Sequence, residues 1–363
     1  MTTVRLYGLT RGHGSYAQVL HGIEYAFRQH GYGPDRCVTV GIEARDEDAP
    51  PSLATADAGV FLGPPIACSA FQQHAEHKVR CVMVAPNSDR LPEATMRVVN
   101  DHATHVLVPS EWAAMVAQRY TERPVIVVPH GVHPEFQPQS APGLERAYEE
   151  GEFRLLHLSS STRERKCTQE VIQAWRWLKR HHALPEAARL WVIVAAETRA
   201  RLIEWCADEG DTLESLGLLI GPRLGVGQDG AAPAELARVF AGVHAVCQPS
   251  RGEAFGMIPL EALATGVPII ATTCTGHSQW FRPGLDGAVP VVTQGIGPID
   301  DLPGARAPRV FVKDIAEAIE FAYENWHKLK AAALVNAQAI RLEWSWERQT
   351  EAFIRWLEGA AQA

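Results

Sequence analysis

The sequence has 363 residues, of which 46% are hydrophobic, and a formal net charge of −8 with a pI near 6.0. This length and apolar content suit two domains, each with its own core. The acidic balance argues against nonspecific nucleic-acid binding, although a local basic cleft is compatible with it. The sequence contains no run of about 18 apolar residues, so no membrane span is predicted. Seven scattered cysteines without a CxxC pair argue against a disulfide framework or a zinc site.

The N-terminal part alternates short apolar runs with longer amphipathic stretches. The segment MTTVRLYGLTRG has no apolar signal-peptide region, so we expect a cytoplasmic protein with reduced thiols. A strand is predicted over 4–9 and a helix over 15–31, and Ser110 is the expected N-cap of a helix over 110–120. Further apolar runs have the character of strands in a covered parallel sheet. They are 37–42, 58–63, 79–85, 105–110 and 125–131.

The pattern breaks over 132–152, which is rich in proline, glutamine and charge and is predicted to be a linker. Strand and helix patterns then resume, with helices expected over 314–329 and 346–361. Two successive strand–helix alternations predict an α/β fold of two Rossmann-like, doubly wound domains. Ligands bind such sheets outside the carboxyl ends of the strands, so we expect the site in a cleft between the domains.

Two glutamates stand in the segment PSRGEAFGMIPLEALATGVPIIA, residues 249–271. Glu253 is predicted at the carboxyl end of a strand, and Glu261 in the helix that follows. A helix N-terminus suits a phosphate, and carboxylates accept hydrogen bonds from sugar hydroxyls. For a lone pair of glutamates, a solvated loop residue and an exposed helix residue are the simpler interpretation. The apolar neighbours of Glu261 and the nearby glycines favour a binding site.

The stretch from Glu253 to Gly266 reads E-A-F-G-x-x-x-x-E-A-x-A-x-G and resembles the glutamate–seven–glutamate motif of retaining GT-B glycosyltransferases of family 4. The resemblance implies a GT-B fold with two Rossmann-like domains facing a central cleft. The implied parts are an acceptor domain (1–145), a nucleotide-sugar donor domain (150–340) and a C-terminal helix (341–363) that crosses back to the first domain. Other segments similar to that family are LVPSEWAAMV (107–116), VPHGVHPEFQP (128–138), RERKCTQEVIQAW (163–175) and WSWERQTEAF (344–353).

The resemblance assigns roles to the two glutamates and to the start of the helix between them. Glu261 is expected to bind the ribose hydroxyls of the nucleotide sugar, and Glu253 to hold a hydroxyl of the donor sugar. The backbone amides of Phe255, Gly256 and Met257 are expected to meet the diphosphate or the sugar.

Basic residues near the start of the second domain are implied to bind the diphosphate. Lys166 is the expected neutralising residue, with Arg165 or Arg163 beside it, and a solvated helix start is the alternative. The family often has glycine–arginine after this strand, whereas this sequence reads Ser-Ser-Ser over 159–161. Either Arg163 substitutes or the serines contact phosphate.

The glycine-rich turn GLTRGHGSY, residues 8–16, follows the first predicted strand. In the resembled family this loop lies near the donor phosphates and the acceptor, which implicates Gly12 and Gly14. His13 is an acceptor or phosphate contact, or a surface histidine without a role.

Acceptor contacts are expected from two further loops. Many family members have a histidine after a strand where this sequence has Asn87, Ser88 and Asp89. Asn87 is an acceptor candidate and Asp89 a candidate for orienting the acceptor hydroxyl, unless Asp89 only closes an Asx turn. His277, in the loop TTCTGHSQWF, is a further acceptor candidate.

The expected reaction is retaining transfer of a sugar from a UDP- or GDP-sugar to a glycan or small-molecule hydroxyl, with no cofactor and no metal. A helix N-terminus and basic side chains can stabilise the departing diphosphate, and no Asp-x-Asp stands at a suitable loop. DNA with a hydroxymethylated base is the alternative acceptor. The rivals are a noncatalytic nucleotide-sugar-binding protein, an epimerase and a phosphorylase. A glycosidase is disfavoured because Glu261 is predicted in a helix beside a diphosphate site.

Overall fold

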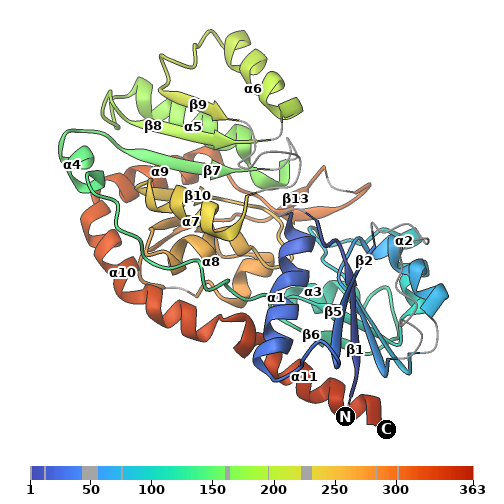
Figure 1. Cartoon of the computed structure of the whole chain (residues 1–363). Helices are drawn as coiled ribbons and strands as arrows, with labels where there is room; N and C mark the ends of the chain where they lie inside the picture. Colours follow the sequence, from blue (N-terminus) through green and yellow to red (C-terminus); the bar gives the residue numbers. More distant parts are fainter. Residues whose placement is uncertain are drawn as a thin grey trace. The chain divides into compact units, whose positions relative to one another are not determined.

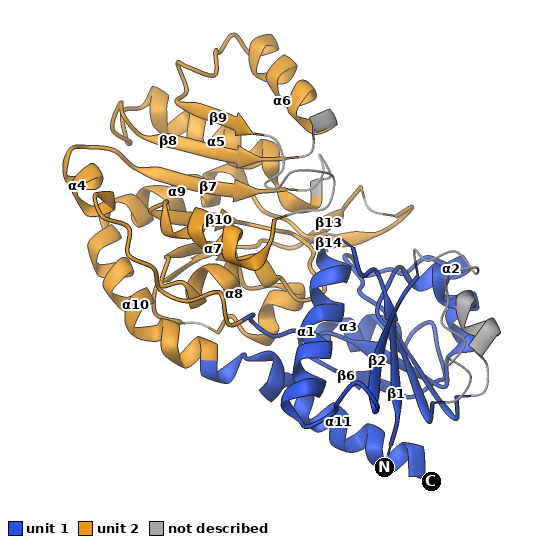
Figure 2. Cartoon of the chain, viewed as in Figure 1, with its two compact units in different colours: residues 1–133, 342–363 blue, residues 134–341 orange. Residues whose placement is uncertain are grey.

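The computed structural model describes residues 2–11, 14–42, 56–74, 77–159, 164–194, 196–221, 231–282, 284–300 and 302–362 (Figure 1). The chain forms two compact units, unit 1 (residues 1–133 and 342–363) and unit 2 (residues 134–341), coloured separately in Figure 2. The first division thus falls between residues 133 and 134, whereas the sequence predicts a first domain that ends at residue 145.

Unit 1 contains a six-stranded sheet in the order β2-β1-β3-β4-β5-β6, and every neighbouring pair is parallel. The strands alternate along the chain with helices and a 3₁₀ segment, as buried parallel strands require for their crossovers. The hydroxyl of Ser110 accepts a hydrogen bond from the Ala113 amide at 3.1 Å, which confirms the predicted N-cap. The elements are β1 (Val4–Gly8), α1 (Ser15–Gln29), β2 (Cys37–Gly41), β3 (Ala58–Phe61), η2 (Pro65–His74), β4 (Val79–Met83), α2 (Glu93–His102), β5 (His105–Val108), α3 (Glu111–Ala117) and β6 (Val125–Val127).

The last helix, α11 (Trp346–Gln362), belongs to unit 1 and packs against α1 (Figure 1). Trp346 is its anchor, since a Cβ on Gly22 would stand 2.1 Å from the indole and one on Gly131 would stand 2.4 Å from the Trp346 backbone. The Val132 amide also donates to the Trp344 carbonyl at 2.7 Å. The C-terminal segment therefore packs so closely on unit 1 that Gly22 and Gly131 leave no room for a side chain.

Unit 2 contains a second six-stranded parallel sheet in the order β12-β11-β10-β7-β8-β9 and a separate antiparallel hairpin of β13 and β14. Its elements are α4 (Leu144–Glu149), β7 (Arg154–Leu158), η3 (Glu164–Lys166), α5 (Thr168–Arg180), β8 (Arg189–Ile193), α6 (Ala196–Asp208), β9 (Leu218–Gly221), α7 (Pro233–Ala241), β10 (Ala245–Gln248), α8 (Met257–Ala264), β11 (Ile269–Thr272), η4 (Thr275–Gln279), β12 (Ala288–Val291), β13 (Ile296–Pro298), β14 (Arg306–Pro308), α9 (Val312–Glu324) and α10 (Trp326–Glu343).

Two expectations about local structure are wrong. The predicted linker contains α4, whose Leu144 and Ala147 are buried, because apolar residues hidden among the charged ones reach the core of unit 2. The predicted helix over 314–329 is two helices, α9 ending at Glu324 and α10 beginning at Trp326. The buried Trp326 indole donates to the His244 carbonyl at 3.0 Å, a tertiary contact that a helical pattern does not reveal.

The strand order of unit 2 defines where a ligand can bind. From β7 the chain proceeds through β8 to β9 on one side, and then crosses to β10 on the other side of β7. The connections leaving β7 and β10 therefore diverge at the carboxyl ends of these two neighbouring strands. Such a topological switch point opens a crevice for ligands in doubly wound sheets.

Candidate functional site

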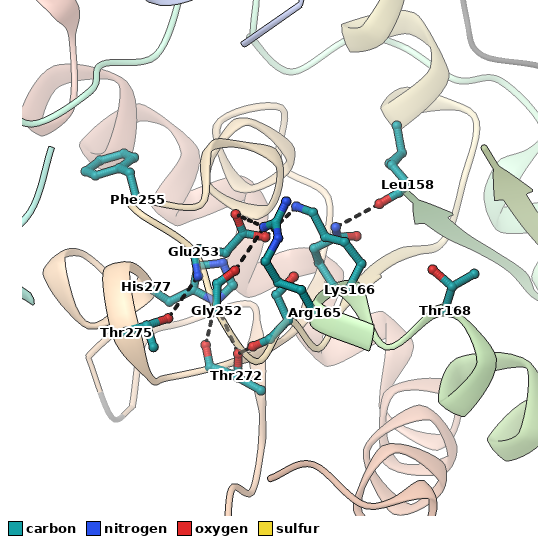
Figure 3. A network of polar contacts seen from close by, with 12 residues as sticks. Leu158, Arg165, Lys166, Thr168, Gly252, Glu253, Phe255, Thr272, Thr275 and His277 are labelled. Atoms are coloured by element: carbon teal, nitrogen blue, oxygen red, sulfur yellow. Dashed lines mark hydrogen bonds and ion pairs between the residues drawn. The ribbon is translucent and has the colours of Figure 1, made fainter. Parts of the chain in front are cut away.

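The segments that follow β7, β10 and β11 come together at the switch point of unit 2 (Figure 3). The segment after β7 provides Arg165 and Lys166, and the one after β10 provides Glu253. The loop after β11 provides Thr275 and His277. These residues are far apart in the sequence, and the parallel strand order brings them to one edge of the sheet.

Glu253 is the centre of this cluster, and only 8% of its surface is exposed. Figure 3 shows its carboxylate directed toward the two basic residues. Lys166 Nζ donates to Glu253 Oε1, and Arg165 Nη1 lies 2.9 Å from Glu253 Oε2. Burial raises the pKa of a carboxyl, but here Lys166 and then Arg165 outweigh it and hold the pKa of Glu253 well below its usual range. The interpretation of Glu253 as a solvated loop residue is wrong.

The two basic residues are themselves held in place. Lys166 is mostly buried, its side chain 13% exposed, so the alternative of a solvated helix start is wrong. Burial lowers its pKa, and the Glu253 carboxylate opposes that shift. Arg165 Nη1 donates to the Gly252 carbonyl at 2.9 Å, and the Arg165 carbonyl accepts from the Arg251 amide at 2.8 Å. Two cations face one carboxylate, so the cluster keeps excess positive charge suited to an anionic ligand.

A buried histidine connects the sheet to the start of α5. One nitrogen of His157, Nδ1, lies 2.8 Å from the Cys247 carbonyl, and the other, Nε2, lies 3.0 Å from Thr168 Oγ1. Because Thr168 follows Lys166 by two residues, this bridge between β7, β10 and α5 orients the segment that carries the lysine. Burial lowers the pKa of His157 to about 4, so its ring is neutral near pH 7.

The loop 253–256 rests on η4 and the residue after it. The Glu253 amide donates to Thr275 Oγ1 at 3.1 Å, and the Glu253 carbonyl accepts from the Gly276 amide at 2.8 Å. Trp280 Nε1 donates to the Phe255 carbonyl at 3.0 Å. The Gly276 backbone lies against Ala254, since an added Cβ would stand 2.3 Å from the Ala254 carbonyl carbon. Residues 253, 254 and 255 are thus each in contact with a residue between 275 and 280.

His277 belongs to this support. The side chain is fully buried, and its Nδ1 lies 2.9 Å from the Thr272 carbonyl. A Cβ on Gly256 would stand 1.9 Å from His277 Cδ2, so the ring fills the space beside that glycine. Burial lowers the pKa of His277 to about 4. The sequence predicts His277 as an acceptor contact, whereas in the structure its buried ring packs against the loop of Glu253.

Glu261 lies in the second turn of α8, which begins at Met257 after Gly256 in the left-handed conformation, with φ +86°. Only 2% of Glu261 is exposed, so its interpretation as an exposed helix residue is wrong. Burial raises its pKa to about 8, and the carboxyl is mainly protonated at neutral pH. Within the described residues, Glu261 Oε2 has no hydrogen-bond partner.

Three other buried polar atoms near the carboxyl ends of β10 and β11 share that property. Gln248 Oε1, Ser250 Oγ and His277 Nε2 also have no hydrogen-bond partner in the part of the chain that the structure describes. Buried polar groups in native proteins are normally paired, so unpaired ones at a switch point are compatible with groups that a ligand completes.

Sequence reasoning missed Ser250, Thr275, Trp280 and His157 as parts of the site. The loop after β11 was noticed, but only for possible acceptor contacts. Trp280 and His157 are hydrogen-bonded to backbone carbonyls. Every residue has a carbonyl, so such hydrogen bonds cannot be recognised from a sequence pattern.

The remaining predicted residues lie in unit 1 or outside the described residues. Gly14 is the N-cap of α1, and a Cβ there would meet nothing within 4 Å. Asn87 and Asp89 follow β4, and the Asp89 carbonyl accepts from Arg119 Nη1 at 3.2 Å. Gly12, His13 and Arg163, together with Ser160 and Ser161, lie outside the described residues.

Two kinds of feature are absent from the residues that the structure describes. In the described ranges no helix has both the length and the apolar character to span a membrane. Among the same residues, no group of three or more histidine, cysteine, aspartate or glutamate side chains is arranged to hold a metal ion.

Comparison with known proteins connects this geometry to a family. A family model described as "Family 4 Glycosyltransferase in conflict systems" matches residues 93–353, well over half of the chain. The D-inositol 3-phosphate glycosyltransferase of Mycobacterium marinum is 34% identical over 98 residues, 25% of this chain and 21% of that protein. The enzyme of the same name from Corynebacterium urealyticum is 38% identical over 55 residues, 15% of this chain and 13% of that protein. The chain thus matches less than a quarter of the length of these curated relatives.

Solved structures match over nearly the whole chain. The crystal structure of Anabaena HepE, in complex with UDP and glucose, has a TM-score of 0.70 at 13% identity and covers 98% of this chain and 100% of its own. Sucrose-phosphate synthase from Thermosynechococcus elongatus has a TM-score of 0.67 at 14% identity, covering 99% of this chain and 100% of its own. The predicted fold class, α/β of the GT-B type with two Rossmann-like doubly wound domains, is confirmed.

Proposed function

The chain belongs to the family 4 glycosyltransferases of conflict systems, and we propose that it transfers a sugar from a nucleoside diphosphate sugar to an acceptor hydroxyl. In this proposal the anomeric configuration is retained and no metal ion takes part. The reaction is inferred from the family and from the chemistry that the cluster at the switch point of unit 2 can perform.

The cluster of Glu253, Lys166 and Arg165 carries the proposal. A buried carboxylate held ionised by two cations is a strong acceptor for sugar hydroxyls. The excess positive charge beside it suits a diphosphate. The start of α8 adds amide groups and a partial positive charge next to Glu253. One site thus combines a sugar acceptor with an anion site, as a nucleoside diphosphate sugar requires.

We assign Glu261 to the ribose of the donor. Its buried carboxyl has an oxygen without a partner among the described residues, and a pair of ribose hydroxyls would complete it. A hydroxyl can donate to one carboxyl oxygen and accept from the other when the group is protonated. Glu261 lies in the second turn of α8 and Glu253 in the loop before that helix, which separates a ribose contact from a sugar contact.

The proposed reaction breaks the bond between the anomeric carbon and the diphosphate oxygen, and forms a bond from that carbon to the acceptor oxygen on the same face. The acceptor proton passes to an oxygen of the leaving diphosphate. Lys166, Arg165 and the start of α8 stabilise the charge that develops on the diphosphate. No protein nucleophile is needed for this step. Stabilisation by fixed positive charge also replaces the role that a metal ion plays in other transferases.

Donor and acceptor are assigned by class. Anabaena HepE was solved with UDP and glucose, which makes UDP-glucose the first donor to test, followed by GDP-sugars. We assign the acceptor, a glycan or small-molecule hydroxyl, to unit 1, where Asn87 and Asp89 follow β4. His277 supports the loop of Glu253 and is not assigned to the acceptor.

The test is release of free nucleotide from UDP-, GDP-, ADP- and dTDP-sugars, with and without EDTA. We expect slow hydrolysis of one donor, at a rate that EDTA does not change. Glu253→Gln and Glu261→Gln should each lower the rate about 100-fold, a magnitude typical of removing one transition-state contact. Glu317→Gln, which changes an exposed glutamate of α9, is the matched control and should leave the rate unchanged.

Each alternative outcome has a defined meaning. A donor that binds without turnover, with or without acceptors, would support a noncatalytic nucleotide-sugar-binding protein. Absence of binding for every nucleotide sugar would refute the proposal. Once a donor is known, acceptors are compared in parallel, glycans and small molecules against DNA with hydroxymethylated bases. The anomeric configuration of the product, read by NMR, decides between retention and inversion.

A further inference from the structure

Arg251 joins the loop of Glu253 to an element outside the main sheet of unit 2. The β13–β14 hairpin pairs residues 296–298 with residues 306–308 in antiparallel register. Arg251 Nε donates to the Pro308 carbonyl at 2.9 Å, and Nη2 donates to the Pro298 carbonyl at 2.7 Å. One guanidinium thus holds both strands of the hairpin.

The backbone of Arg251 is fixed at the same time on the opposite side. Its amide donates to the Arg165 carbonyl at 2.8 Å, and Glu253 is only two residues further along the chain. The residue therefore lies between the basic segment after β7 and the hairpin. A shift of its backbone would move Glu253 relative to Arg165 and Lys166.

The burial of Arg251 makes this connection obligatory. Only 9% of the residue is exposed, and a buried guanidinium requires acceptors because its desolvation is costly. The two proline carbonyls are fixed acceptors at opposite ends of the strand pair. The rigid fork of an arginine can reach both, whereas a lysine presents a single ammonium.

Within the described residues, the buried apolar residues of the hairpin form a cluster separate from the main core of unit 2. Its buried residues Ile299, Ala305 and Ala307 form a separate small cluster with the partly buried Leu302. The base of the hairpin is closed by hydrogen bonds from Gln294 to Arg309 and from Arg309 to Gly295, at 3.0 and 3.1 Å. Gln294 Nε2 at this base also donates to Asp314 Oδ2 of α9 at 3.1 Å, whereas the hydrogen bonds of Arg251 connect the hairpin to the loop of Glu253.

We infer that Arg251 is a positioning residue, which couples the β13–β14 hairpin to the loop 250–256 and thereby sets Glu253 against Lys166 and Arg165. The inference rests on the proposed function, because it gives Arg251 a part in the reaction of that site. Arg251 acts through the loop and not on the substrate.

The test compares Arg251→Gln and Arg251→Lys with Arg238→Gln, a change of an exposed arginine on α7. Hydrogen exchange should accelerate about tenfold or more in peptides covering 294–309 and also in those covering 249–256 for both Arg251 variants. In turnover, kcat should fall about 10- to 100-fold, the range expected when a catalytic group is misplaced. The donor KM should change less than about threefold, since most binding contacts remain. Arg238→Gln should match the wild type.

A second variant approaches the coupling from the hairpin. Ala307→Asp places a charge in the small cluster of the hairpin and leaves Arg251 in place. It too should accelerate exchange in the loop 249–256 and lower kcat. If Arg251→Gln destabilises all of unit 2, the coupling between the hairpin and the loop is tested with Ala307→Asp and Arg251→Lys instead.

Two results would overturn the inference. One is faster exchange confined to the hairpin with an unchanged loop, and the other is an unchanged kcat in both Arg251→Gln and Ala307→Asp. Hydrogen exchange tests the coupling between hairpin and loop without any turnover. A wild type that transfers no sugar would therefore refute the proposed function, and the exchange data would still test the coupling. The pH dependence of kcat separates positioning from general destabilisation. A displaced Glu253 would lose the cations that hold its pKa low, so the acid limb of kcat should move to higher pH at temperatures where the variant stays folded.

Discussion

Replacing Gly256 by alanine should destabilise unit 2 through two separable effects. The residue has φ +86° and ψ +65°, a left-handed conformation that alanine adopts only with strain. The new Cβ would also stand 1.9 Å from His277 Cδ2 and 2.2 Å from Nε2, so the ring would have to move. The ring is not free to do so, because it is fully buried and its Nδ1 lies 2.9 Å from the Thr272 carbonyl.

The magnitude follows from the two effects. The left-handed conformation costs about 1–2 kcal/mol for a residue with a Cβ. Forcing a side chain out of a packed site costs a further ~1–3 kcal/mol. Gly256→Ala should therefore lower the free energy of unfolding by about 2–5 kcal/mol. With His277→Ala in the background, only the conformational part should remain, so the coupling free energy of the double-mutant cycle should be about 1–3 kcal/mol.

The assay is urea unfolding of the four proteins in the cycle, with hydrogen exchange of peptides from β10 and α8 to assign the transition to unit 2. Gly210→Ala is the matched control, since Gly210 has φ +78° and a Cβ there would meet nothing within 4 Å. It should show the conformational cost alone. A cost for Gly256→Ala no larger than that for Gly210→Ala, or one unaffected by removing the ring, would refute the reasoning.

Two further predictions concern burial. Burial raises the pKa of Glu261 from the ordinary 4.5 of a glutamate to about 8, so between these values the folded state binds more protons than the unfolded state. Stability should therefore fall as pH rises from about 5 to 8, by up to ~1.4 kcal/mol per pH unit, and Glu261→Gln should remove that part of the slope in urea titrations. Gly131→Ala should destabilise unit 1 by about 1–3 kcal/mol, because its Cβ would stand 2.4 Å from the Trp346 backbone, and limited proteolysis should then cut within 342–363 sooner than in the wild type. Unchanged proteolysis of that segment would contradict the anchoring role of Trp346.

Local sequence determined the strands, several helices and the motif. β-branched apolar runs are sufficient to predict buried parallel strands, and Ser110 is sufficient to predict a helix start, because both depend on interactions between near neighbours in the chain. The spacing of Glu253 and Glu261 likewise follows from one strand end and one helix. The break between α9 and α10 could not be predicted, since it depends on Trp326 reaching a carbonyl 82 residues away in the chain.

Tertiary structure alone decided how the site is assembled. Lys166 and Glu253 are 87 residues apart, and they meet only because β7 and β10 are neighbours in the sheet. The hydrogen bonds from Arg251 to the hairpin and the packing of His277 beside Gly256 likewise depend on the tertiary structure. The pKa values of Glu253 and Glu261 move in opposite directions although both are buried glutamates. Lys166 and Arg165 lower the pKa of Glu253, whereas burial raises that of Glu261. Residue types are local properties of a sequence, whereas burial and charge neighbours are set by strand order and long-range packing.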